Sequence, residues 1–139
     1  MSTEENKAVA RRFGGVWDAS WSESLVDELA APNLYVMYPL MPEPARSADE
    51  FKQVLRMVHT AFPDLKLGFD DTVAEGDRVA VRWTLSGTHK GDMMGIPATG
   101  KAVRWTGMTM YRIVDGKVVE EVGEEDGLGL LRQIGAIPS

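Results

Sequence analysis

The sequence predicts an α+β fold, in which a curved antiparallel sheet forms a cone-shaped cavity covered by three N-terminal helices, with a short C-terminal helix. Apolar residues recur at helical spacing up to about residue 61, and from Asp64 onward the period changes to two. A short helical pattern then follows Asp126. Helices that precede a strand meander must pack against one face of its sheet. The open end of a curved sheet is the concave type of site that small ligands use.

Local signals place the three helices. Ser2 and Glu5 have the spacing of a capping box and predict the start of the first helix. Residues 22–30 form a short second helix, which stops before a proline. Ser47 opens the third helix through a second capping box, and this helix runs to about residue 61.

The strands follow from alternation of apolar and polar residues. A tight hairpin at Asp115-Gly116 is expected to place Met110 opposite Glu121. The long connection 90–100, with three glycines, is expected to form a lip over a pocket. The expected strands are residues 33–38, from 64 to a turn at 75–77, 79–88, 101–114 and 117–123.

Composition limits the class of protein. The 139 residues include no cysteine, are 44% apolar and 26% charged, and predict a single globular domain over 1–139. A net charge of −6 has the wrong sign for a binder of nucleic acid or of anionic membranes. We find no signal-peptide core and no long apolar run, which predicts a cytoplasmic protein. A hydrophobic small molecule is the expected partner.

Six segments, in order along the chain, resemble the SnoaL-like polyketide cyclases of the nuclear transport factor 2-like superfamily. The resemblance implies an α+β cone, a homodimer joined through the outer sheet face, and no metal or organic cofactor. Cyclase members close a ring in an aromatic polyketide by intramolecular aldol condensation. The segments are AFPDL (61–65), AEGD (74–77), GTHKG (87–91), GIPATGK (95–101), RIVDGKV (112–118) and LGLLRQIG (128–135).

The resemblance also indicates where catalytic side chains would stand. The aspartate base of the cyclases falls on Gly123 and an assisting histidine falls on Thr109, so both are absent here. Glu121 shares strand parity with Gly123 and is the candidate base, or else a solvated rim residue. Asp126 is a second candidate base or a helix cap. Tyr38 is a candidate oxyanion donor or an ordinary packed aromatic.

A larger set of residues is expected to form the substrate surface. Aromatic and methionine side chains suit a flat polycyclic ligand, although the same residues are typical of any core. Glu124 and Glu125 are expected in solvent at the strand-to-helix corner, and a side chain of aspartate size is expected to fit at Gly123. The candidate substrate-binding residues are Trp17, Trp83, Trp105, Met108, Met110, Thr109 and His59.

Three functions fit this sequence. The first is a cofactor-independent enzyme, of the cyclase, isomerase or lyase type, that acts on a hydrophobic polyketide-type carbonyl compound by acid–base chemistry. The second is a non-catalytic binder of an apolar ligand, because the usual acid and histidine positions are Gly123 and Thr109. The third is an enzyme of the same fold with different chemistry, such as epoxide opening or hydroxylation. Fold alone does not separate them.

Overall fold

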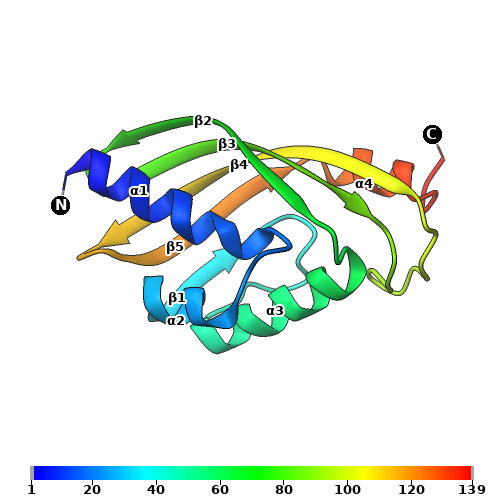
Figure 1. Cartoon of the computed structure of the whole chain (residues 1–139), viewed down its shortest axis with the longest axis horizontal. Helices are drawn as coiled ribbons and strands as arrows, with labels where there is room; N and C mark the ends of the chain where they lie inside the picture. The colour runs from blue at the N-terminus through cyan, green and yellow to red at the C-terminus, as the bar shows by residue number, and fades with distance from the viewer. Residues whose placement is uncertain (1, 139) are drawn as a thin grey trace.

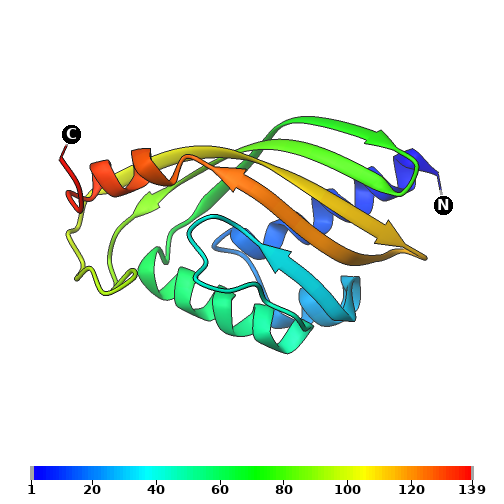
Figure 2. The same ribbon diagram turned by 180° about the vertical axis from the view of Figure 1, so that it is seen from behind.

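A computed structural model describes residues 2–138, in which a five-stranded sheet arches over three helices (Figure 1). The α+β class and the short C-terminal helix are confirmed. The chain ends lie at opposite ends of the molecule, as the view from behind also shows (Figure 2). The elements in chain order are α1 (Thr3–Gly14), η1 (Gly15–Trp17, a 3₁₀ turn), α2 (Glu23–Leu29), β1 (Ala30–Met37), α3 (Ala48–Ala61), β2 (Lys66–Glu75), β3 (Arg78–Thr88), β4 (Ala102–Val114), β5 (Lys117–Glu125) and α4 (Gly127–Gln133).

The sheet is mixed and open, which corrects the prediction of an antiparallel sheet. Its strand order is β1-β5-β4-β3-β2, and β1 runs parallel to β5, whereas the other pairs are antiparallel. About 80 residues of helix and meander separate the two parallel strands, which gives the long connection that parallel pairing needs. Strand β1 lies at the edge of the sheet, and an edge strand tolerates a proline such as Pro32. The N–H that proline lacks is not needed for pairing inside the sheet.

Side-chain caps begin α1 and α3 where the sequence predicts them. The Ser2 hydroxyl accepts from the Glu5 N–H at 3.1 Å, and the Glu5 carboxylate accepts from the Ser2 N–H at 3.0 Å. Ser47 caps α3 in the same way, through the N–H of Glu50 at 3.0 Å. The first helix ends at Gly14, so Trp17 lies in η1 and not in the α-helix itself.

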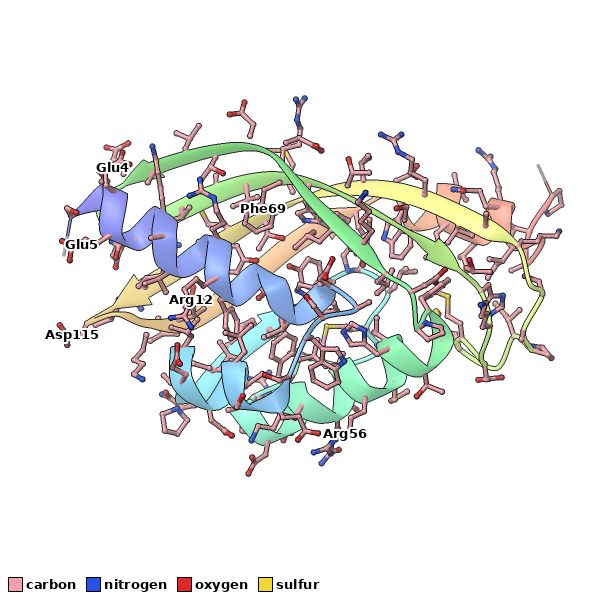
Figure 3. The ribbon with its side chains drawn as sticks, in the orientation of Figure 1. Glu4, Glu5, Arg12, Arg56, Phe69 and Asp115 are labelled. Carbon is pink, nitrogen blue, oxygen red and sulfur yellow. The ribbon has the colours of Figure 1, made fainter. Side chains whose placement is uncertain are left out.

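Helix α1 lies close against the inner face of the sheet. The Phe69 ring on β2 points toward this helix, as the side-chain view shows (Figure 3). A Cβ added at Gly14 would lie 2.3 Å from Cζ of that ring. The absence of a side chain at Gly14 therefore allows helix and sheet to approach at this point.

A bulge changes the register of the β4–β5 hairpin. Asp115 and Gly116 both have positive φ, as the expected tight turn requires. The pairing slips between Ile113, opposite Val118, and Arg112, opposite Glu120, which leaves one extra residue on β5. As a result Glu121 lies opposite Tyr111, and the expected pairing of Glu121 with Met110 is wrong.

Alternation along the strands separates a buried face from an exposed face. On β4, Thr109 and Tyr111 are buried, whereas Met108 and Met110 are exposed on the outer face.

Within residues 2–138, no helix is both long and apolar enough to cross a membrane.

Candidate active site

Glu121 is the only carboxylate among the fully buried side chains of residues 2–138. It has 0% exposure on the inner face of β5, which confirms the prediction from strand parity that it faces inward. Its Oε2 accepts from the Tyr38 hydroxyl at 2.6 Å and from the Trp17 Nε1–H at 2.8 Å. Among the residues that the structure describes, its Oε1 has no hydrogen-bond partner. One carboxylate oxygen is thus fixed in place and the other is free.

Two further side chains extend this contact across the sheet. The Tyr38 and Thr109 hydroxyl oxygens are 2.7 Å apart. Thr109 also accepts from the Trp83 Nε1–H at 2.9 Å. Strands β3, β4 and β5 each supply one residue and Tyr38 directly follows β1, so the order of these strands in the sheet builds the cluster.

Burial controls the protonation of the cluster. Desolvation raises the pKa of Glu121 from its ordinary 4.5 to about 7, although hydrogen bonds from Tyr38 and Trp17 act in the opposite direction. Burial and the neighbouring Glu121 carboxylate raise the pKa values of Tyr38 and Tyr111 well above the ordinary 10. Near neutral pH, the group in this cluster that gains or loses a proton is Glu121.

Tyr38 fills the space beside Gly123. A Cβ at Gly123 would lie 2.2 Å from Cε1 of Tyr38 and 2.7 Å from the Met108 carbonyl oxygen. The expectation that an aspartate side chain fits there is therefore wrong, because the phenol ring already occupies that volume. The acid of this site stands two residues earlier, at Glu121.

The structure places two other predicted residues outside the cluster. Asp126 is exposed, and its carboxylate accepts from the Gly129 N–H at 2.9 Å as the cap of α4. His59 is buried, its Nε2 lies 2.7 Å from the Val16 carbonyl oxygen, and its ring stacks on Trp21. His59 therefore holds η1, the segment that carries Trp17.

Both methionines predicted to bind substrate lie on the wrong face for this cluster. Met108 and Met110 are 55% and 42% exposed on the outer face of β4, opposite the side from which Thr109 contacts Tyr38. Strict alternation along the strand places Met108 and Met110 on the face opposite to that of Thr109. A ligand beside Glu121 would therefore lie on the other side of the sheet from the two methionines.

Glu125 is a partly buried carboxylate, which corrects the prediction that it lies in solvent. It is mostly buried at the end of β5, accepts from the Trp105 Nε1–H at 3.1 Å, and has its pKa raised by desolvation. The signal was available, because Glu125 has the same strand parity as Glu121 and Gly123. Trp105 thus contacts Glu125 and Phe62, away from the contacts made by Glu121.

Two surface hollows lie apart from Glu121. One is on the outer sheet face, between Arg82 and Arg104, and the other is at the β-turns beside Asn6 and Asp77. Over the described part of the chain, no group of three His, Asp or Glu side chains is arranged to hold a metal ion.

Known proteins resemble this chain in sequence. The sequence profile of the SnoaL-like polyketide cyclases matches residues 7–134. Aklanonic acid methyl ester cyclase DauD from Streptomyces sp. strain C5 is 34% identical over 70 residues, which cover 50% of this chain. The match covers 42% of DauD, so the chain spans less than half the length of this relative.

Solved structures resemble it over nearly the whole chain. AclR, a candidate hydroxylase from Streptomyces galilaeus, is 33% identical with a TM-score of 0.85, over 99% of this chain and 85% of AclR. A candidate SnoaL-like polyketide cyclase from Jannaschia sp. CCS1 has a TM-score of 0.88 at 23% identity, over 98% and 95% of the two chains. An NTF2-like protein from Burkholderia xenovorans LB400 has a TM-score of 0.75 at 18% identity, over 97% and 99%. The last two show the fold alone, which is NTF2-like, and the profile match establishes that this chain belongs to the SnoaL-like polyketide cyclase family.

Proposed function

We propose that this protein is an enzyme that removes a proton next to a carbonyl group of a hydrophobic polyketide-type compound, with Glu121 as the general base. The observation that carries the proposal is the state of this carboxylate. It is fully buried, its pKa is raised to about 7 by desolvation, and its Oε1 has no partner among the described residues. A base with a pKa near the working pH combines a useful ionised fraction with a strong affinity for the proton.

The three acid–base reaction types considered for this protein share that step. Base-catalysed aldol cyclisation, and base-catalysed isomerisation or dehydration next to a carbonyl group, proceed through an enolate, which forms when a base takes a proton from the carbon beside the carbonyl group. The similarity to DauD, an aklanonic acid methyl ester cyclase, supports an aromatic polyketide ester as the first substrate class to test. The proposed step uses acid–base groups of this chain.

Tyr38 acts in this proposal through Glu121. A phenol has one hydrogen to donate, and the Tyr38 hydroxyl donates it to Glu121 Oε2 at 2.6 Å. The same hydrogen is not available to a substrate oxyanion while this bond exists. Tyr38 is therefore a positioning residue for the base, in place of the oxyanion donor expected from the sequence.

Substrate access to Glu121 requires a side chain to move. Trp17 contacts the buried carboxylate and is itself only partly buried, so it connects the cluster with the surface. Its ring packs edge-on against Tyr38 and Phe51, at centroid distances of 5.6 and 5.5 Å. We expect ligand entry to displace the Trp17 indole, which makes tryptophan fluorescence a reporter of binding.

The test is turnover of aklanonic acid methyl ester by the purified protein, followed by chromatography of the product. Glu121→Gln keeps an acceptor for Tyr38 and Trp17 but loses the base, and the expected loss of rate is roughly 10²–10⁴-fold with binding retained. Glu124→Gln is the matched control, because Glu124 lies on the same strand and is exposed.

Each outcome separates one function from another. Turnover that disappears in Glu121→Gln and persists in Glu124→Gln supports the proposal. Turnover by Glu121→Gln at the wild-type rate contradicts the role of Glu121. Quenching of tryptophan fluorescence without any turnover contradicts the enzyme and favours the non-catalytic binder. An oxygenated product instead of a cyclised one would favour the hydroxylating alternative, which is included because of the similarity to AclR.

A further inference from the structure

A chain of hydrogen bonds leads from β3 to the buried carboxylate on β5. Trp83 Nε1 lies 2.9 Å from Thr109 Oγ1, which lies 2.7 Å from the Tyr38 hydroxyl, which lies 2.6 Å from Glu121 Oε2. Trp83, Thr109 and Tyr38 are all buried. We call these four residues the indole-to-carboxylate chain.

The chemistry of the donors gives this chain a single direction. An indole N–H can only donate, so Thr109 Oγ1 accepts from Trp83. The hydroxyl hydrogen of Thr109 is then available for the Tyr38 oxygen, and the hydrogen of Tyr38 goes to Glu121. Hydrogen bonds in series polarise one another, so each donor strengthens the next.

We infer that Trp83 and Thr109 are positioning residues, which hold the Tyr38 hydrogen on Glu121 Oε2 and thereby leave Oε1 as the oxygen that takes the substrate proton. The inference rests on the proposed function, in which Glu121 is the base. In the step, the substrate C–H bond breaks, its electron pair remains on carbon as the enolate, and the proton forms a bond with Oε1. Oε2 keeps the hydrogen bond from Tyr38 before and after the transfer, so no bond of the indole-to-carboxylate chain has to break.

Few groups compete for control of Glu121. The titratable side chains that interact with it are Tyr38, directly after β1, and Tyr111 from β4, and Trp17 from η1 supplies the remaining hydrogen bond. Thr109 contacts Glu121 only through Tyr38 in the bonds described above. A substitution at Thr109 that changes the protonation of Glu121 therefore acts through the indole-to-carboxylate chain.

The test measures the titration of Glu121 by ¹³C NMR on protein that carries glutamate labelled at its carboxyl carbon. The resonance missing from Glu121→Gln identifies the group. Thr109→Val removes the hydroxyl at nearly constant volume and is expected to raise the titration midpoint of Glu121 by a few tenths to about one pH unit, because the Tyr38 donor is weakened. Thr109→Ser restores the hydroxyl and is expected to return the midpoint to the wild-type value.

Trp83→Phe provides an independent variant, since it removes the indole N–H and the fixed direction of the Thr109 hydroxyl. It is expected to raise the midpoint by a smaller step than Thr109→Val, and it carries the test should Thr109→Val not fold, as judged by near-ultraviolet circular dichroism. An unchanged midpoint in the folded variants overturns the inference. The experiment measures a proton equilibrium, so an unchanged midpoint does not contradict the proposed function. Absence of turnover contradicts the proposed function but does not contradict the indole-to-carboxylate chain.

Discussion

Glu121 couples folding to pH, because its pKa is about 7 in the folded protein and 4.5 is the ordinary value. Between these values the folded chain holds a proton that the unfolded chain has released, so stability falls as pH rises from 4.5 to 7 and is level above. The shift corresponds to a loss on the order of 3 kcal/mol.

Urea unfolding of wild type and Glu121→Gln checks this prediction at the residue scale. Wild type is expected to lose stability relative to Glu121→Gln as pH rises from about 5 to about 7. The difference between their unfolding free energies is expected to stay constant at higher pH. Two parallel curves over this range would show that Glu121 titrates alike in the folded and unfolded chain, and would contradict its burial as the cause of the shift.

The sequence predicts single residues well where a local rule decides their position. Parity with Gly123 predicts that Glu121 faces inward, and the structure confirms it. The same rule would have placed Glu125 inside, but its position at the strand-to-helix corner favoured solvent. The bond from Tyr38 to Glu121 joins residues 83 positions apart. No sequence spacing predicts a contact at such a separation, so the direction of the Tyr38 hydrogen required the structure.

Strand β5 depends on the missing side chain at Gly123. The Tyr38 ring and the Met108 carbonyl oxygen occupy the space that a Cβ would need, so Gly123→Ala is expected to destabilise the fold by about 1–3 kcal/mol. Gly68→Ala is the matched control, because its Cβ would be in ordinary contact at 3.8 Å from Asp70. Equal unfolding free energies for the two variants would contradict the close packing of Tyr38 against β5.

Elements defined by local chemistry follow the prediction, and those defined by distant pairing do not. The caps of α1 and α3 and the Asp115-Gly116 turn each depend on residues only a few positions apart in the sequence. All three are confirmed. The parallel pairing of β1 with β5 brings together segments with most of the chain between them. The bulge in β5 shifts the register by one residue without a signal in the alternation.

At the scale of the whole molecule, the outer sheet face remains the expected dimer interface. Met108, Met110 and Val122 are 55%, 42% and 39% exposed there, on the neighbouring strands β4 and β5. We expect a homodimer by light scattering at micromolar concentration, and Met108→Lys is expected to shift it toward the monomer because a buried unpaired charge is costly. Met57→Lys on α3, where the side chain is 71% exposed, is the control that should keep the dimer. A monomer mass for wild type would contradict the prediction.

In the proposed function, a buried carboxylate with a near-neutral pKa does the chemistry of this molecule. The most direct measurement is the pH dependence of kcat/KM for aklanonic acid methyl ester, compared between wild type and Glu121→Gln. Wild type is predicted to gain activity as pH rises and to level off above about 7, where Glu121 is ionised. The variant is predicted to lose both the activity and this limb of the profile. Wild-type kcat/KM with the same pH dependence in Glu121→Gln would contradict the account.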